Sequence, residues 1–130
     1  MRIIQQQNNL SVWQECLDLL QEIYALTKIF PSEEKEGLSL KLRESAINII
    51  SGISKWKSQS LKINKSHYLY FSLENANEIE ALLLISHTLR YITKDQFDTN
   101  TSGIQRIIIM LSDLIKKVEH KENLNKENNN

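Results

Sequence analysis

Six basic side chains gather in the middle of the sequence, where they could bind the phosphates of a nucleic acid. They are Lys41, Arg43, Lys55, Lys57, Lys62 and Lys65. Glu44 is the only acid within this stretch, so its local charge is +5. Lysine and arginine that contact phosphates release condensed counterions, which supplies most of the sequence-independent affinity for nucleic acids. We therefore predict that these six residues form a nucleic-acid-binding surface.

The position of Trp56 leaves two interpretations open for the lysines around it. An exposed indole among cations could stack on a base while the cations contact phosphates. Alternatively, Trp56 completes the apolar row of a helix, and the lysines belong to a solvated linker. We favour the second interpretation for Trp56, and both interpretations remain open for the lysines.

The charge of the whole chain does not name a partner. Sixteen basic and sixteen acidic residues give a net charge of zero, so any attraction to nucleic acid must come from local clustering. Charge is nevertheless segregated, because the segment 66–89 holds three acids and no Lys or Arg.

The groups that could carry catalysis or hold a metal do not converge. A di-iron bundle needs Glu-x-x-His on two helices, and the sequence contains no such pair. His67 and His87 lie twenty residues apart, on nearly opposite faces of one helix, and Cys16 lies in an apolar row without a basic neighbour to activate it. Glu74 and Glu78 are one turn apart, and we expect them to meet cations rather than share a proton. We predict no catalytic residue, no metal site, no cofactor and no enzyme activity.

Helices must position all of these side chains. Three Gly and one Pro are too few for the many turns of a β-sandwich or barrel. Apolar residues at spacings of three and four predict helices over residues 11–30, 38–56, 66–91 and 94–118. The clearest row, in the second helix, consists of Leu42, Ala46, Ile49, Ile53 and Trp56. Helices of these lengths suit an antiparallel up-down four-helix bundle with short loops, so the predicted fold class is all-α.

The bundle is expected to occupy residues 10–119. Residues 1–9 are predicted to be a flexible N-terminus. Residues 120–130 are predicted to be a disordered tail, because one residue in the ten after His120 is apolar and such a segment buries too little surface to offset its ordering entropy.

The first helix carries more apolar surface than one core needs. Beside the row of Trp13, Leu17, Leu20, Tyr24 and Thr27 runs a second row that includes Val12, Leu19 and Leu26. Because these last three residues repeat every seven positions, we predict that they are buried between subunits of a homo-oligomer.

The third helix mixes polar residues into its apolar row. That row contains Tyr68, Phe71, Leu82, Ile85 and Leu89. Asn75 and Glu78 fall on the same face. We therefore expect a polar group in or beside the core at this helix.

The expected compartment is a reducing cytoplasm. The single cysteine excludes an internal disulfide, and the N-terminus lacks the apolar run of a signal peptide. The longest apolar runs, such as residues 81–85, fall far short of the roughly 20 residues of a membrane span, so we expect no membrane association.

Several short motifs resemble one bacterial family. They are Leu10-Ser-Val-Trp-Gln14, Ile23-Tyr-Ala-Leu-Thr27 followed by Phe30-Pro31, Glu36-Gly-Leu38 ahead of Arg43-Glu-Ser-Ala46, and Glu78-Ile-Glu80 with Leu82. Over residues 10–118 the chain resembles the four-helix-bundle proteins encoded in intervening sequences of large-subunit ribosomal RNA genes. That family is in turn similar to the accessory variability protein of diversity-generating retroelements, a partner of a reverse transcriptase. The resemblance implies a ring-like homopentamer without a known catalytic site, associated with structured RNA or with a reverse transcriptase complex.

Two stretches depart from the family pattern. Where the family has Ser-Ile-x-x-Asn-Ile-Ala-Glu-Gly, the segment 48–56 retains only the two isoleucines. In the third helix, Glu74 and Asn75 replace small residues, while Glu78 and Glu80 are retained. Any role that the family gives to the altered positions is therefore not carried over to this chain.

Two functional hypotheses follow. The first is a non-enzymatic oligomeric accessory protein that binds nucleic acid, with structured RNA as the expected ligand, or a reverse transcriptase, through repeated basic patches. The alternative is a protein-only oligomeric scaffold or adaptor. Salt separates them, because phosphate contacts weaken steeply with ionic strength and an apolar docking face does not.

Overall fold

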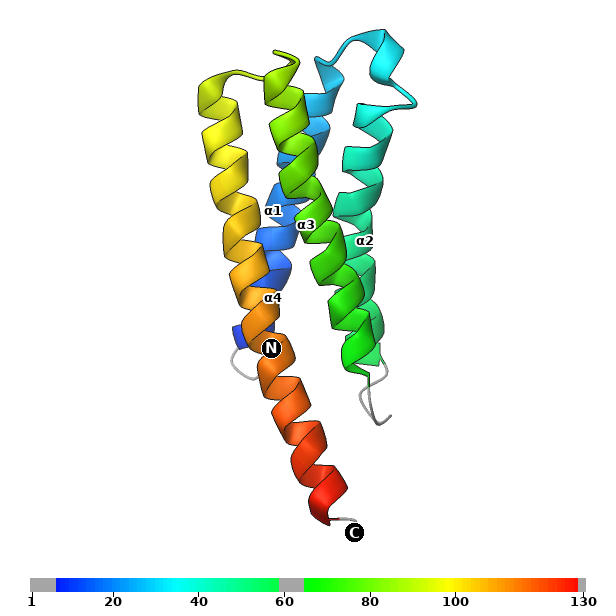
Figure 1. Cartoon of the computed structure of the whole chain (residues 1–130), viewed down its shortest axis with the longest axis vertical. Coiled ribbons are helices and arrows are strands. Elements are labelled where there is room, and N and C mark those ends of the chain that lie inside the picture. Colours follow the sequence, from blue (N-terminus) through cyan, green and yellow to red (C-terminus); the bar gives the residue numbers. More distant parts are fainter. Residues whose placement is uncertain (1–6, 59–64, 129–130) are drawn as a thin grey trace.

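The computed structural model describes residues 7–58 and 65–128. Four helices are packed side by side (Figure 1), and they are α1 (Gln7–Lys28), α2 (Leu38–Ser58), α3 (Ser66–Thr88) and α4 (Lys94–Asn128). A short 3-10 turn, η1 (Ser32–Glu34), lies between α1 and α2. Each helix packs against the next along the chain, and α4 packs against α1, which closes the bundle. The predicted all-α, antiparallel up-down four-helix bundle is confirmed.

All four helices contribute to a single core. Its fully buried aliphatic side chains are Ile23, Leu42, Ile49, Ile53, Leu69, Ile79, Leu83, Ile104, Ile107 and Leu111. The row predicted for the second helix is buried along its whole length, and Trp56 at its end is 8% exposed. The interpretation of Trp56 as the last member of that row is confirmed.

Pro31 ends the first helical segment, as the sequence predicts, because a proline has no N–H to continue the hydrogen-bond ladder. The segment after it forms the 3-10 turn η1, and α2 begins at Leu38, where the sequence predicts the second helix to start. Glu34 stabilises this turn from both sides. Its Oε1 accepts a hydrogen bond from the Leu38 backbone N–H at 3.3 Å, and its Oε2 accepts one from the Tyr91 hydroxyl at 2.9 Å. The turn is thereby tied both to the start of α2 and to the loop after α3.

Close contact between α2 and α3 depends on small and polar residues. A Cβ at Gly52 would collide with the Ser72 hydroxyl and with the Tyr68 carbonyl oxygen. The Ser72 hydroxyl donates to the Ile49 carbonyl at 2.8 Å, and Asn48 donates to the Asn75 side-chain oxygen at 3.2 Å. Asn75 is 8% exposed, so the polar group expected in or beside the core of the third helix is present.

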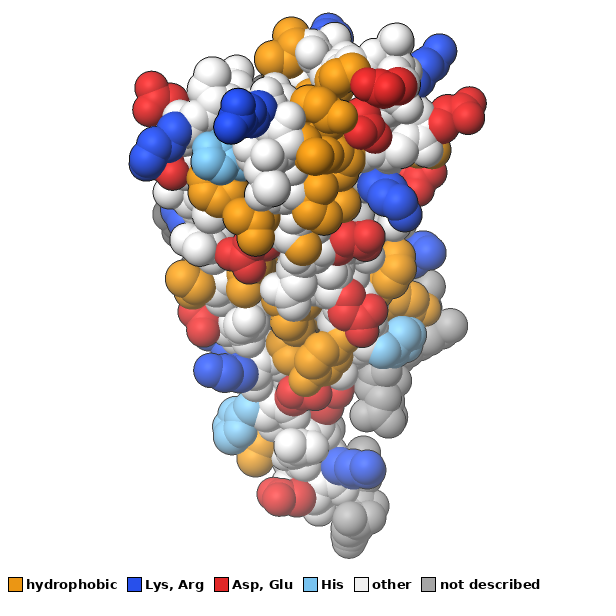
Figure 2. Space-filling view, turned by 45° about the horizontal axis from the view of Figure 1, so that its top comes forward, with side chains coloured by type: hydrophobic (Ala, Val, Ile, Leu, Met, Phe, Trp, Pro, Cys, Tyr) orange, Lys and Arg blue, Asp and Glu red, His pale blue; other side chains and the backbone are white. Residues whose placement is uncertain are grey.

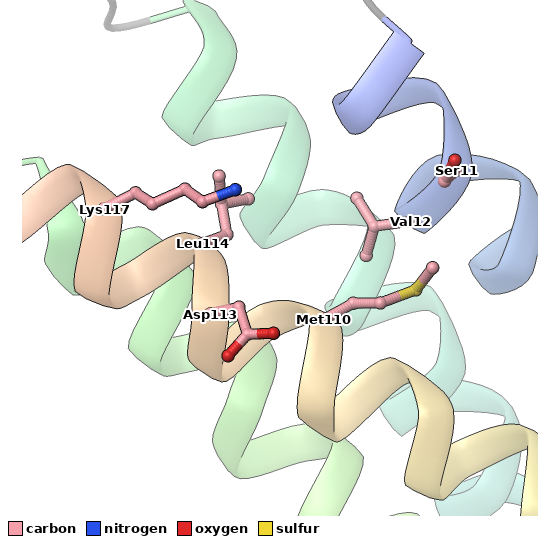
Figure 3. A pocket seen from close by; sticks show the side chains of 6 residues that line it. All are labelled: Ser11, Val12, Met110, Asp113, Leu114 and Lys117. Carbon is pink, nitrogen blue, oxygen red and sulfur yellow. The ribbon is translucent and has the colours of Figure 1, made fainter.

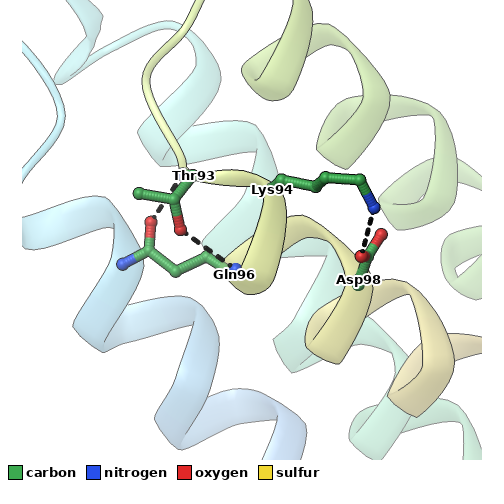
Figure 4. A network of polar contacts seen from close by, with 4 residues as sticks. All are labelled: Thr93, Lys94, Gln96 and Asp98. Atoms are coloured by element: carbon green, nitrogen blue, oxygen red, sulfur yellow. Dashed lines mark hydrogen bonds and ion pairs between the residues drawn. The ribbon is translucent and has the colours of Figure 1, made fainter.

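The start of α4 is fixed by a reciprocal cap (Figure 4). The Thr93 hydroxyl accepts a hydrogen bond from the Gln96 backbone N–H at 3.1 Å, and the Gln96 side chain accepts one from the Thr93 N–H at 2.9 Å. This is a capping box, which satisfies two backbone donors that a helix start leaves free. Lys94 and Asp98, one turn apart, form an ion pair at 2.8 Å.

The C-terminal segment is helical where the sequence predicts disorder. α4 runs to Asn128 and extends beyond the other helices in Figure 1, so the prediction of a disordered tail is wrong for residues 120–128. Two acids near its end bind α3. Glu119 accepts a hydrogen bond from the Tyr70 hydroxyl at 3.0 Å, and Glu122 accepts one from the Lys65 N–H at 3.1 Å. Composition alone does not reveal these tertiary contacts.

The N-terminal prediction is only partly within the described chain. Gln7–Asn9 belong to α1, so the helix begins earlier than the predicted bundle, and the remainder of the predicted flexible segment lies outside the described residues. The described residues contain no helix long and apolar enough to cross a membrane.

Candidate nucleic-acid interface

The five predicted basic residues that the structure describes do not form one continuous patch. Lys41 and Arg43 lie near the start of α2, whereas Lys55 and Lys57 lie in its last turn. Fourteen residues separate Lys41 from Lys55, about 21 Å along a helix. We call Lys41 and Arg43 the first basic group. The second basic group consists of Lys55, Lys57 and Lys65, and Lys62 lies outside the described residues.

The second basic group is placed to meet an anionic partner. Lys55 and Lys57 are exposed, and neither forms an ion pair within the part of the chain that the structure describes. Cations also suit this place locally, because a helix C-terminus carries partial negative charge. The two lysines are therefore available to bind phosphates without loss of an internal contact.

Lys65 is partly committed to the bundle. Its Nζ lies 5.3 Å from the centre of the Trp56 ring, and its backbone N–H donates to Glu122. Desolvation lowers the pKa of its amine, Glu122 partly opposes this effect, and the nearby Lys121 adds to it. Lys121 is thus a further cation at this end of the molecule that sequence reasoning missed, because α4 reaches it only through the unexpected extension of the helix.

The buried indole of Trp56 is not available to stack on a base. Its Nε1 has no hydrogen-bond partner in the described residues. Within this group the cations, and not the aromatic ring, remain as candidates for nucleic-acid contact.

The first basic group faces the turn between α1 and α2. Lys41 is exposed, and Arg43 is half-buried. Arg43 Nε donates to the Thr27 hydroxyl at 2.8 Å, and its guanidinium carbon lies 4.5 Å from the centre of the Tyr24 ring. Lys28 and Lys35 line the same open cavity as Arg43. Sequence reasoning missed both, and the available signal was Pro31, which forces the chain to turn between them.

Acidic and apolar side chains occupy the helix next to α2. Glu74 and Glu78 on α3 are exposed and in no ion pair within the described residues, and Glu80 accepts a hydrogen bond from Gln105 at 3.2 Å. The expected pairing of Glu74 and Glu78 with cations within the chain is not observed there. The cations of α2 and the acids of α3, which the sequence shows to be segregated, therefore lie on two neighbouring helices.

A group of large apolar side chains is also exposed along α3. We call it the α3 apolar face, and its members are Tyr70, Phe71, Leu84, Ile85 and Leu89, from 40% to 56% exposed. Figure 2 shows hydrophobic side chains gathered over the upper middle of this side of the molecule, with acidic side chains beside them. The exposed acids Glu74 and Glu78 lie on the same helix, so the exposed surface of α3 is both apolar and acidic.

The structure corrects the predicted oligomer interface on the first helix. Val12, Leu19 and Leu26 are 3%, 5% and 4% exposed in the single chain, inside the core. Residues that the chain already buries leave little surface for a second subunit. The adjacent row, which includes Trp13 and Leu17, is the half-buried one.

An open cavity of about 260 Å³ lies between α1 and α4 (Figure 3). It is lined by Ser11 and Val12 from α1 and by Met110, Asp113, Leu114 and Lys117 from α4. Its one acid and one cation offer no pattern of catalytic or metal-ligating groups. Within residues 7–58 and 65–128, no three His, Cys, Asp or Glu side chains are arranged to hold a metal ion.

The chain matches known proteins both in sequence and in fold. A family model described as 23S rRNA-intervening sequence protein matches residues 8–113. A solved structure of a protein of unknown function from the S23 ribosomal protein family, from Bacteroides thetaiotaomicron, is similar with a TM-score of 0.76 and 24% identity, over 84% of this chain and 98% of that one. At this identity, the likeness shows the fold. No curated protein matches the chain.

Proposed function

The chain belongs to the 23S rRNA-intervening sequence protein family, and from this premise we propose that it is a non-enzymatic, oligomeric accessory protein that binds structured RNA. The observation that carries the proposal is the second basic group. Lys55 and Lys57 are exposed and lack an acid partner within the described residues. Cations of this kind bind phosphates and release the counterions condensed on the nucleic acid.

We expect strong RNA binding to require assembly, because one copy carries few exposed cations. With a net charge of zero, one copy has weak attraction for RNA, whereas a ring repeats the basic groups and gains avidity. The α3 apolar face supports assembly, and its proposed occupant is a second copy of this chain. In the proposed contact a different surface of the next copy covers this face, which makes a head-to-tail arrangement that can close a ring and leaves Lys55 and Lys57 free. A pentamer is the ring size that the family resemblance suggests.

The test is RNA binding by full-length protein at several salt concentrations. We expect the double variant Lys55→Glu/Lys57→Glu to keep its helicity, since both side chains are exposed, and to lose RNA affinity. Its salt dependence should flatten, because each phosphate contact contributes about 0.7 to 0.9 to the magnitude of the slope of log affinity against log salt. Lys65 stays unchanged in this variant, because a carboxylate there would face Glu122.

A matched control is available on α4. Lys116 and Lys117 are also exposed neighbours near the same end of the bundle, and Lys116→Glu/Lys117→Glu makes the same change of charge. It should weaken RNA binding less. If wild-type protein bound no RNA at low salt, or the α2 variant bound as well as wild type, the RNA proposal would fail.

The second candidate is a protein-only oligomeric scaffold or adaptor, with a reverse transcriptase among its possible partners. The α3 apolar face favours it, because apolar surface of this kind is typical of protein contacts. A partner interaction that is insensitive to salt, without RNA affinity, would support this candidate. In either case we propose the cytoplasm as the compartment, since the chain's single cysteine matches a reducing environment.

A further inference from the structure

A cationic cavity of about 320 Å³ lies where α1 turns into α2. Its polar lining consists of three cations and three hydroxyl groups, from Thr27, Lys28, Ser32, Lys35, Ser39 and Arg43. No carboxylate lines the cavity. At about 30 Å³ per water molecule, the space is large enough for a phosphate group together with part of the molecule that carries it.

Arg43 is held in place with its terminal nitrogens unoccupied. The Thr27 hydroxyl donates to the Ile23 carbonyl at 2.7 Å and accepts from Arg43 Nε at 2.8 Å, while the guanidinium lies over the Tyr24 ring. No carboxylate in the described residues pairs with Arg43. Its two Nη groups keep their donors, and a planar pair of donors matches two oxygens of a phosphate.

Ser39 adds a hydroxyl donor to the lining. The residue is 6% exposed and lines the cavity. Its hydroxyl is not among the buried polar atoms without a partner, so water reaches it from the cavity. A bound oxyanion could accept a hydrogen bond from this hydroxyl in place of that water.

The acids of the turn do not neutralise the cavity. Glu34 binds the Tyr91 hydroxyl and the Leu38 N–H and is not among the lining residues. Glu33 and Glu36 are exposed and are not among the lining residues. Lys28 and Lys35, both exposed, are free to swing their amines over an anion.

We propose that this cavity binds a phosphate group, with Arg43 and Ser39 as the fixed donors and with Lys28 and Lys35 closing over the anion. The phosphate belongs to a free phosphate ion or to a phosphate monoester such as a nucleotide. Arg43 lies twelve residues before Lys55, about 18 Å along α2, so the site is separate from the second basic group and does not depend on the RNA proposal. It goes beyond that proposal because it selects one phosphate group instead of attracting a polyanion.

The test is titration calorimetry of the full chain with inorganic phosphate. Thermal shift is avoided, because phosphate stabilises folded proteins without binding to a site. Wild-type protein should bind one phosphate per chain. Arg43→Gln should weaken binding by at least about tenfold, since a charge-assisted hydrogen bond is lost. The control Lys41→Gln, an exposed cation two residues away that does not line the cavity, should bind as wild type does.

Two further variants protect the test against misfolding of Arg43→Gln. Lys28→Gln/Lys35→Gln changes only exposed side chains, and Ser39→Ala removes one hydroxyl. Both should keep wild-type helicity and bind phosphate more weakly. The proposal would be overturned if wild-type protein did not bind phosphate. It would also be overturned if Lys28→Gln/Lys35→Gln and Ser39→Ala both bound phosphate as tightly as wild type.

The source of the phosphate is distinguished by two more titrations. A nucleoside 5′-monophosphate that binds more tightly than inorganic phosphate would identify nucleotides as the ligand class, and equal affinities would identify the free ion. Both results support the phosphate site. A nucleoside without its phosphate should not bind, and if it bound as tightly as the monophosphate, the proposal would be wrong.

Discussion

Cys16 and Arg43 both carry reactive or ligand-binding groups, and the extent of burial decides which of them is accessible. Cys16 is 1% exposed, and desolvation, with a smaller contribution from Glu15, raises the pKa of its thiol to about 12. Arg43 is only half-buried and lines an open cavity. The thiol is therefore a core side chain, and the guanidinium is the group that remains available to a ligand.

The first prediction concerns Cys16. Only a thiolate attacks a disulfide reagent, and at pH 8 a shift of the pKa from 9.0 to about 12 lowers the thiolate fraction by roughly a hundredfold or more. Native protein should therefore react with an aromatic disulfide reagent at least about a hundred times more slowly than protein in denaturant. Absorbance of the released thiol measures both rates. Equal rates would show that Cys16 is exposed in the native state.

The α2–α3 contact shows how a pair of elements depends on single atoms. Gly52 allows the two backbones to approach, and Ser72 and Asn75 use the short distance to form hydrogen bonds to α2. A larger residue would push the helices apart and break these bonds together.

The second prediction concerns Gly52. In Gly52→Ala, the new methyl group would meet the Ser72 hydroxyl and the Tyr68 backbone oxygen, and the backbone cannot move aside cheaply. We expect the free energy of unfolding to fall by about 1–3 kcal/mol, as measured by denaturant titration.

A matched glycine in α4 gives the opposite expectation. At Gly103 an added Cβ would approach only an Arg106 side-chain atom, at 3.8 Å. Gly103→Ala should raise the free energy of unfolding by up to about 1 kcal/mol, since alanine favours a helix over glycine. If both substitutions stabilised the protein, the close approach of α2 and α3 would be refuted.

At the scale of the whole molecule, the surface divides into parts of different character. α3 has no Lys or Arg in its length and exposes the α3 apolar face beside acids. α2 carries cations without acid partners in the described residues. The cations of α2 and the acids of α3 thus lie on two helices that pack against each other.

The third prediction concerns assembly. Wild-type protein should sediment as a homo-oligomer, and Leu84→Lys/Ile85→Lys should reduce its mass to that of a monomer while helicity is retained, because both side chains are already exposed in the single chain. The control is Ile109→Lys on α4, which replaces an isoleucine that is 61% exposed and lies off the α3 apolar face. It should sediment as wild type does. If wild-type protein were a monomer, or if the α3 variant kept the wild-type mass, both the proposed ring and the proposed gain in RNA affinity from it would be refuted.

The spacing of apolar residues, and the residues that begin and end helices, determined the fold. The buried row of α2 follows from apolar spacing, the end of α1 from Pro31, and the start of α4 from residues 93–96, where Thr and Gln cap the helix. These features act within one or two helical turns, so they can be inferred without knowledge of the rest of the chain. The charge segregation between α2 and α3 was equally evident, because it depends only on residue types.

Tertiary structure decided the rotation of each helix and the contacts at its ends. On α1 two adjacent apolar rows are equally good candidates for burial by their spacing, and only the positions of α2 and α4 select the row of Val12 over the row of Trp13. The C-terminal helix is bound through Glu119 and Glu122 to α3, far away in sequence. Lys28, Lys35 and Arg43 likewise come together only when the chain turns at Pro31. A local pattern fixes which faces of a helix are apolar, whereas the neighbours that cover those faces, and the side chains that meet at a turn, are fixed only when all four helices pack.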